Sequence, residues 1–152
     1  MDLILWRHAD ALYTTPDLPR ELSPKGFKQA KRMGQWLDAR LPENCRVLSS
    51  PATRALQTVE ALGRKYKIHP ELAPDASALQ LLQAINWPHG KEAVLVVGHQ
   101  PTLGQVASTL LFGREDEFEI RKGYVCWISQ REREGSVVTW MKALLGPDLC
   151  SK

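Results

Sequence analysis

Short apolar segments alternate with amphipathic segments along this chain, and the alternation predicts an α/β fold. The first six residues are mostly apolar or strand-favouring and run directly into Arg7 and His8, as a short strand buried on both faces would. Residues 93–97 are apolar throughout and rich in β-branched side chains, which predicts a central strand ending at Gly98-His99. The remaining strands are expected at residues 46–49, 68–72 (a brief one), 124–129 and 137–140.

Between these segments, apolar residues recur at three- and four-residue spacing, which predicts helices. Ser23-Pro24 reads as a helix start, a capping serine followed by proline at the first helical position, and Pro42 is expected to end that helix. Ser50-Pro51 repeats this signature and opens a helix to about residue 65. Two further helices are expected at 77–85 and 102–111. The predicted buried stripes contain Phe27, Ala30, Gly34, Leu37 and Leu41 in the first helix, Ala55, Val59, Leu62 and Tyr66 in the second, and Leu79, Leu82 and Ile85 in the third.

The order of these elements predicts a three-layer α/β/α architecture with a mostly parallel central sheet. The last two strands are joined by the polar residues 131–135 and are expected to form a hairpin at the edge of the sheet. Residues 9–21 have no periodicity and are rich in Pro, Thr and Asp, so they are expected to form a loop of the kind that often binds ligands. No repeat, linker or low-complexity segment divides the chain, which predicts a single domain spanning residues 1–152.

Composition and charge narrow the possible partners. The 152 residues have a net charge of +3, which is too small to indicate nucleic-acid binding and allows a modest preference for anionic ligands. The basic residues Lys25, Lys28, Lys31 and Arg32 are interpreted as a solvated helix face rather than a binding patch. No apolar run approaches the ~20 residues that a membrane helix needs, and the apolar start of the chain is too short for a signal peptide. Three widely spaced cysteines without a C-x-x-C motif fit a reducing cytosol, so a cytoplasmic protein is expected.

Candidate chemistry lies where three predicted strands end. The first strand ends at Arg7-His8, the second at Ser49-Ser50-Pro51 with Arg54 one turn into the next helix, and the fourth at Gly98-His99. The carboxyl ends of parallel strands share one edge of the sheet, which is where ligands bind in open α/β folds. Two histidines and two arginines are therefore expected to converge there. The remaining histidines, His69 and His89, match no motif and are interpreted as surface residues.

This set of motifs resembles the histidine phosphatase superfamily, which includes the phosphoglycerate mutases. The short length and the segment Pro70-Glu71-Leu72-Ala73-Pro74 are most similar to its branch of SixA-type phosphohistidine phosphatases. The resemblance implies a phosphoglycerate mutase-like fold, and the four motifs span nearly the whole chain, which leaves no room for a cap domain. The motifs are Arg7-His8-Ala9, where the family usually has Arg-His-Gly, then Leu22-Ser23-Pro24-Lys25-Gly26-Phe27-Lys28-Gln29-Ala30, Ser49-Ser50-Pro51-Ala52-Thr53-Arg54-Ala55-Leu56-Gln57-Thr58, and Val97-Gly98-His99.

The chemistry of phosphoryl transfer suits these residue types. Arg7 and Arg54 can make bidentate contacts with phosphate oxygens, and their charges are expected to keep His8 neutral and therefore nucleophilic. The resemblance implies that His8 becomes the phosphohistidine of a covalent intermediate. His99 is expected to donate to the phosphoryl oxygens, assisted by backbone N–H groups near Gln100 at the start of the following helix. No metal-binding or nucleotide-binding motif is present, so neither a metal nor another cofactor is predicted.

One expected element is missing. Family members that act on alkyl phosphates usually carry a general-acid carboxylate shortly after the third strand, but this segment reads Leu72-Ala73-Pro74. Glu71 and Asp75 flank it and Asp10 and Asp17 lie in the first loop, all interpreted as solvated loop carboxylates. An alkoxide leaving group needs such an acid, whereas a phosphorylated imidazole leaves easily once its other ring nitrogen is protonated. The short chain also predicts a shallow, open pocket.

The sequence therefore predicts a monomeric protein phosphohistidine phosphatase. The resemblance implies that its partner is a histidine phosphotransfer domain or a phosphocarrier protein. A phosphatase for a small phosphorylated metabolite, with Glu71 or Asp75 as its acid, is the alternative, followed by a non-catalytic module that binds phosphohistidine. A mutase is disfavoured, because it must exclude water and an open pocket does so poorly.

Overall fold

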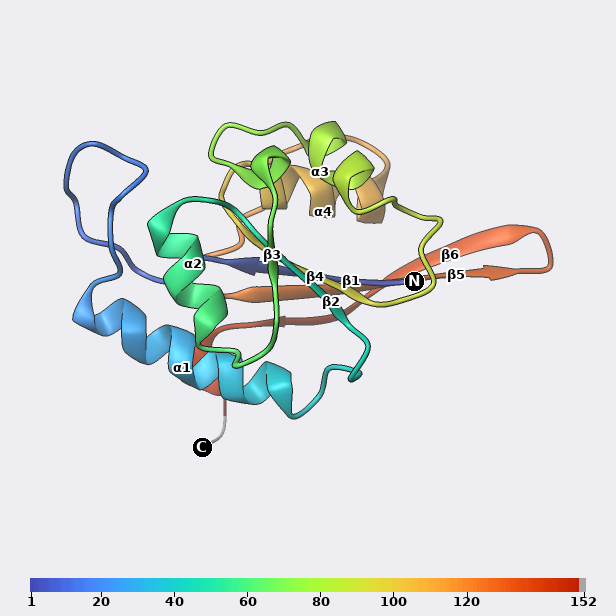
Figure 1. The fold of residues 1–152 in the computed structure, drawn as a ribbon. Helices are drawn as coiled ribbons and strands as arrows, with labels where there is room; N and C mark the ends of the chain where they lie inside the picture. Colours follow the sequence, from blue (N-terminus) through green and yellow to red (C-terminus); the bar gives the residue numbers. More distant parts are fainter. Residues whose placement is uncertain (151–152) are drawn as a thin grey trace.

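The strands of this chain form one sheet in the order β3-β2-β4-β1-β5-β6 in the computed structural model, which describes residues 1–150 (Figure 1). The first four strands in the chain pair in parallel and the last two in antiparallel fashion, so the predicted mostly parallel sheet is confirmed. The predicted domain of residues 1–152 extends to two residues that lie outside the described ones. The strands are β1 (Asp2–Arg7), β2 (Arg46–Ser49), β3 (Lys67–Ile68), β4 (Val94–Gly98), β5 (Val125–Arg133) and β6 (Ser136–Leu145).

Helices cover both faces of the sheet, which confirms the three-layer prediction. On one face lie α1 (Pro24–Asp38) and α2 (Thr53–Glu60), and on the other lie α3 (Ala78–Ala84) and α4 (Thr102–Phe112) (Figure 1). Two short 3₁₀ turns, η1 (Pro70–Leu72) and η2 (Pro147–Leu149), complete the described elements. None of the helices among residues 1–150 is long and apolar enough to cross a membrane.

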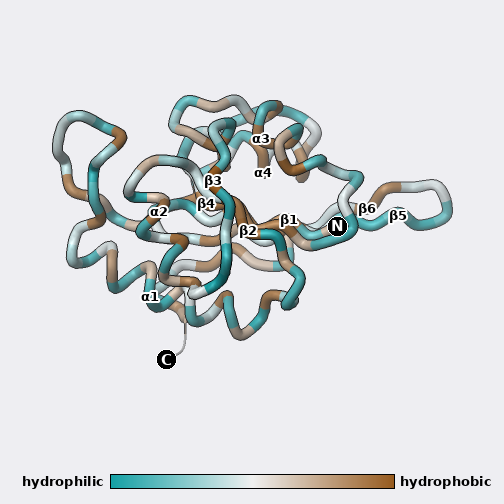
Figure 2. Tube along the Cα trace, in the orientation of Figure 1, coloured by the Kyte–Doolittle hydropathy of each residue, from teal (hydrophilic) through white to brown (hydrophobic). Residues whose placement is uncertain are grey.

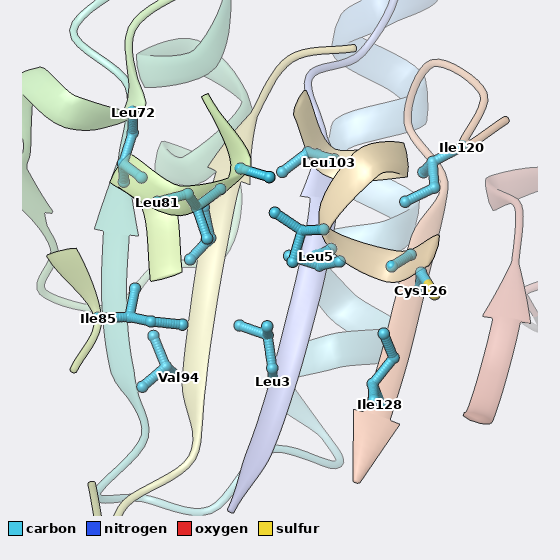
Figure 3. Packing of buried hydrophobic residues seen from close by; sticks show 14 of the residues in the cluster. Leu3, Leu5, Leu72, Leu81, Ile85, Val94, Leu103, Ile120, Cys126 and Ile128 are labelled. Carbon is cyan, nitrogen blue, oxygen red and sulfur yellow. The ribbon is translucent and has the colours of Figure 1, made fainter. Parts of the chain in front are cut away.

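The alternation of side chains along β1 joins the two outer layers to the sheet. Leu3 and Leu5 point into the cluster under α3 and α4, where Leu81 and Leu103 lie beside them (Figure 3). The intervening residues of β1 belong to the opposite cluster with residues of α1 and α2. All four side chains of residues 3–6 are fully buried, and each such burial contributes about 1.5–3 kcal/mol. The brown segments that mark hydrophobic residues accordingly run through the central strands in Figure 2.

Backbone hydrogen bonds extend the sheet just past the ends of its central strands. The His8 N–H donates to the Gly98 carbonyl (3.1 Å), and the Ser50 N–H donates to the Val97 carbonyl (3.0 Å). The next residue after β4 is His99, so three chain segments leave the sheet side by side. This pairing places the residues that follow β1, β2 and β4 at one edge.

The predicted helices are present, but the structure corrects their bounds and parts of their buried stripes. α1 ends at Asp38 rather than at Pro42, and α2 covers only Thr53–Glu60 because the chain turns at Gly63, where φ is +76°. Phe27 is 48% exposed and Leu79 is 64% exposed, so both were wrongly predicted to be buried. In α1 the buried line runs instead through Gly26 and residues 30, 33, 34 and 37, and Phe27 lies at the edge of this line.

The prediction of a brief strand at 68–72 was only partly right, because the strand ends at Ile68 and Pro70 begins the 3₁₀ turn. The final hairpin is longer than predicted. Its polar residues 131–133 belong to β5, and the connection is only Glu134-Gly135, whose φ angles of +51° and +80° suit a two-residue turn between strands. The hairpin tip projects beyond the body of the sheet (Figure 1), so both faces meet solvent and its strands carry polar residues. Of these two strands, only β6 lies at an edge of the sheet, because β5 also pairs with β1.

Gly34 lets α1 approach the end of α2, and we expect Gly34→Ala to destabilise the protein. A Cβ at this position would lie 2.6 Å from the backbone carbonyl oxygen of Ala61, which cannot move away as a flexible side chain could. The expected loss is about 1–3 kcal/mol in urea denaturation, although alanine favours helices more than glycine does. The exposed neighbour Gln35→Ala is the matched control and should lose nothing. Equal stability of the two variants would contradict the proposed close contact.

Candidate active site

Three of the predicted site residues meet at the carboxyl edge of the sheet. His8 follows β1, Arg54 lies in the first turn of α2, and His99 follows β4. All three are buried, with exposed fractions of 7%, 4% and 5%. The rings of the two histidines lie 5.1 Å apart between centroids, and Arg54 Nη2 lies 3.5 Å from His99 Nδ1. The structure thus brings together two histidines and a guanidinium from segments that are far apart in the sequence.

A hydrogen bond to the backbone fixes which nitrogen of His8 is reactive. His8 Nδ1 lies 2.8 Å from the carbonyl oxygen of Ala9. A carbonyl oxygen can only accept, so Nδ1 carries the hydrogen and Nε2 keeps its lone pair. Thr58 holds this turn in place, because its hydroxyl accepts from the Ala9 N–H (3.1 Å) and donates to the Arg54 carbonyl (2.7 Å).

His8 is neutral, as the sequence predicted, but the main cause differs from the predicted one. The pKa of His8 is lowered to about 4, mainly by burial, and the charges of Arg54 and Arg7 contribute to this lowering. The bond to the Ala9 carbonyl acts in the opposite direction. The sequence argument named only the guanidiniums, since the depth of burial was not visible in the residue pattern.

His99 has a different set of neighbours. Its Nδ1 faces Arg54, whose guanidinium can only donate, so the proton of the neutral ring lies on Nε2. His99 Nε2 then donates to the hydroxyl of Ser50 at 2.8 Å. Burial is the largest cause that lowers the pKa of His99 to about 3, and the neighbouring His8 and Arg54 add to it. The predicted donation from His99 to phosphoryl oxygens stays a prediction.

Both predicted arginines carry buried N–H groups without an acceptor among residues 1–150. Arg54 donates from Nη1 to the Asp17 carbonyl (3.0 Å) and from Nη2 to the Asp17 carboxylate (3.1 Å), while its Nε has no partner. Arg7 donates from Nη1 to the Ile120 carbonyl (3.1 Å), and its Nε is likewise unpaired. An unpaired buried donor costs about 1–3 kcal/mol. An oxyanion bound beside these donors would satisfy them.

Two residues of the site were missed by the sequence analysis. Ser50 was interpreted as a helix cap, but α2 begins later and the Ser50 hydroxyl instead contacts His99. Asp17 was interpreted as a solvated loop carboxylate, and although it is half exposed it binds both Arg54 and Arg20. Its position three residues before Arg20 in the loop after the first strand was the only available signal.

The remaining carboxylates lie elsewhere. Asp10 was also interpreted as solvated, but it accepts from the Ser23 hydroxyl (2.6 Å) and from Lys122 (3.2 Å). Glu71 Oε2 lies 2.6 Å from His69 Nδ1, and with Asp75 Glu71 lines a separate cavity of about 390 Å³ beside η1. His69 is therefore only partly exposed and His89 is exposed.

Burial raises the pKa of Asp17, but hydrogen bonds from Arg20 and Arg54 outweigh this effect and hold the pKa below its usual range. Asp17 is therefore ionised near neutral pH. An ionised carboxylate has no proton to donate, so Asp17 does not supply the general acid that an alkyl phosphate ester requires.

Gln100 is tied to the loop before β5 by its side chain. Its Nε2 donates to the Phe118 carbonyl (3.0 Å), and its Oε1 accepts from the Gly104 N–H (2.8 Å). The predicted contribution of backbone N–H groups near Gln100 remains a prediction. Among residues 1–150, no group of three or more His, Cys, Asp or Glu side chains could hold a metal ion.

Comparisons with known proteins agree with this geometry. A family model described as the histidine phosphatase superfamily (branch 1) matches residues 3–78. The phosphohistidine phosphatase SixA of Escherichia coli K12 is 34% identical over 123 residues, which cover 74% of this chain and 76% of that protein. A structure of the protein histidine phosphatase SixA complexed with tungstate matches with a TM-score of 0.78 and 27% identity over 97% of this chain and 98% of that one. A structure named as an α-ribazole-5′-P phosphatase from E. coli matches with a TM-score of 0.72 and 18% identity. The match covers 97% of this chain and 98% of that one, and it confirms the fold class alone.

The buried neutral histidines predict that acid destabilises this protein before its carboxylates are protonated. The pKa of His8 is about 4 in the folded state and about 6.5 in the unfolded chain. Between these values the unfolded state binds the additional proton, so the free energy of unfolding falls as the pH falls from 6.5 to 4, by about 3 kcal/mol from His8. Urea denaturation across this range measures the loss. His8→Asn lacks the titrating group and should lose correspondingly less, so parallel pH curves for the two proteins would contradict the argument.

Proposed function

This chain belongs to the histidine phosphatase superfamily and is a hydrolase of the phosphatase type, and from this premise we propose that it removes phosphate from phosphohistidine in proteins, with His8 as the nucleophile. The observation that carries the proposal is the state of His8. Its Nδ1–H is bonded to the Ala9 carbonyl, and burial keeps the ring neutral, so a lone pair on Nε2 is available in the pocket at neutral pH.

In the first step, the Nε2 lone pair of His8 attacks the phosphorus of the substrate, and the bond from phosphorus to the substrate imidazole breaks. The phosphorylated substrate ring carries a proton on its other nitrogen near neutral pH, so it leaves as a neutral imidazole. His8 already carries a hydrogen on Nδ1 and becomes the equivalent protonated phosphohistidine. The exchange is symmetric and needs no proton from a third group.

In the second step, water attacks the phosphorus and the bond to His8 Nε2 breaks. The electron pair returns to Nε2, and both hydrogens of the water stay with the phosphate at first. Inorganic phosphate and neutral His8 are the products. The bond from Nδ1 to the Ala9 carbonyl holds the ring orientation through both steps.

Cationic groups around His8 stabilise the phosphoryl group during transfer. The unpaired N–H groups of Arg54 and Arg7 are suited to its equatorial oxygens, where negative charge accumulates. Asp17 must share Arg54 with the incoming phosphate, because it occupies two of the arginine nitrogens in the structure. His99 lies against both His8 and Arg54. We propose that its Nε2–H leaves the Ser50 hydroxyl and donates to a phosphoryl oxygen when the substrate binds.

The carboxylates support a phosphorus–nitrogen substrate over a phosphate ester. The carboxylate closest to the site, Asp17, is ionised, and Glu71 is engaged with His69. A small-metabolite phosphatase with Glu71 or Asp75 as its acid therefore has no specific contact in its favour. The relatives named SixA support the same choice. The proposed partner is a phosphorylated histidine phosphotransfer domain or phosphocarrier protein, and a monomeric cytoplasmic enzyme remains a prediction from the sequence.

A covalent intermediate should accumulate on His8. When the protein is mixed with a phosphorylated histidine phosphotransfer domain and quenched rapidly, we expect acid-labile, base-stable phosphate on the peptide that contains His8, detected by mass spectrometry. His8→Ala should lose the label and at least about 10³-fold in turnover, as expected when a nucleophile is removed. Full turnover by His8→Ala would overturn the mechanism.

Substrate chemistry should separate the two phosphatase hypotheses. We expect kcat/KM for free phosphohistidine to exceed that for an alkyl phosphate such as glycerol phosphate by at least about 10²-fold, because general acid catalysis typically contributes that much and the ester needs it. Phosphate release from both compounds is measured under the same conditions. Comparable rates would refute the argument from the missing acid and favour a metabolite phosphatase.

A further inference from the structure

A basic groove lies beside the catalytic pocket, and among its lining residues the chemistry described above uses only Arg7. It has a volume of about 820 Å³ and is bounded by α1, by the segment before β5 and by η2. Six basic residues line it: Arg7, Lys25, Lys28, Arg32, Arg121 and Lys122. Three acidic residues, Asp10, Glu119 and Asp148, also line it, so the net charge of the groove is +3, as large as the net charge of the whole chain.

Most of these cations form no ion pair among the described residues. Lys122 pairs with Asp10 at 3.2 Å, but Lys25, Lys28, Arg32 and Arg121 form no ion pair with any residue among 1–150. Lys28 and Arg32 stand one helical turn apart, an arrangement of like charges that costs a helix about 0.2–0.5 kcal/mol. An anion bound in the groove would offset this repulsion.

The helix distinguishes groove residues from merely solvated ones. Lys25, Lys28 and Arg32 lie on one side of α1 and line the groove, whereas the equally exposed Lys31 does not. The sequence analysis interpreted all four as one solvated face. The structure divides them into three that line a concave surface and one, Lys31, that does not.

Arg7 connects the groove to the catalytic pocket. Its side chain lines the groove, and its charge also lowers the pKa of both His8 and His99. A substrate whose phosphoryl group lies at His8 would therefore continue past Arg7 into the groove.

The size and lining of the groove fit a polypeptide better than a small molecule. From Lys25 to Arg32 the helix rises about 10 Å, which corresponds to about three residues of extended chain. Its lining is mainly charged, whereas small-molecule sites are predominantly apolar with few polar groups.

We propose that this groove binds acidic side chains of the phosphoprotein substrate that flank its phosphohistidine, and that Lys25, Lys28 and Arg32 thereby select the partner. The inference rests on the proposed function, because it assumes that a protein is bound at His8. Charge complementarity of this kind increases association rates and discriminates against partners of the wrong charge. Basic segments beside a phosphohistidine would be repelled.

Two short phosphohistidine peptides test the proposal, one flanked by glutamates and one by lysines. With the full-length protein, we expect kcat/KM to favour the glutamate peptide by about tenfold at low salt. The preference should shrink as salt is raised, because the Debye length falls from about 10 Å at 0.1 M to about 3 Å at 1 M. In the variant Lys28→Glu/Arg32→Glu the preference should disappear or reverse.

The matched control is Lys31→Glu/Lys91→Glu, which changes the net charge equally at exposed positions outside the groove. It should keep the wild-type preference. If the wild type shows no preference, or if the preference falls equally in both variants, the groove proposal is wrong. Hydrolysis of both peptides would still support the proposed function in that case. If the wild type hydrolyses neither of the two peptides nor free phosphohistidine, the proposed function is wrong, and this inference falls with it.

Discussion

The parallel pairing of β1 with β4 is the constraint on which the site depends. Arg7 is paired with Gly98, and the His8 N–H continues the ladder to the Gly98 carbonyl, so His8 and His99 leave the sheet together. The register is enforced by burial, because residues 3–6 of β1 fill cores on both faces of the sheet. A slip of one residue would exchange the two faces and move the nucleophile away from His99. The chemistry is therefore positioned by apolar side chains that never touch a substrate.

Burial that holds the fold together also sets the reactivity of the site. It is the largest influence on the pKa of both histidines and keeps them neutral without a partner of opposite charge. The same burial leaves the Nε groups of Arg7 and Arg54 without an acceptor in the described part of the chain, a cost that is present before any substrate binds. Such sites give up some stability for function, and here two unpaired arginine donors lie at the carboxyl edge of the sheet, where a phosphoryl group would bind.

The sequence was informative where one physical requirement decided the outcome. The central strands had to be apolar because both faces are covered, so the strand ends, and with them Arg7, His8 and His99, could be located.

The sequence was less informative where two physical requirements compete. Ser50-Pro51 has the composition of a helix cap, yet its serine contacts His99, because the tertiary fold brings that ring within 2.8 Å. Phe27 has the spacing of a core residue, but the close approach of Gly26 to the first loop turns it to solvent. The link between Asp17 and Arg54 joins a loop without periodicity to a helix, and no local pattern encodes it.

A single hydroxyl group, that of Thr58, joins the segment that carries the nucleophile to the helix that carries Arg54. One oxygen atom accepts from the backbone beside the nucleophile and donates to the backbone of the arginine, and thus acts as a spacer between the two halves of the pocket. A valine has nearly the same shape and would fill the same fully buried space, yet it would leave the Ala9 N–H without its acceptor. The side chain at this position therefore acts through its hydrogen bond rather than through its volume, because only an acceptor there holds the turn that carries the nucleophile against the helix that carries Arg54.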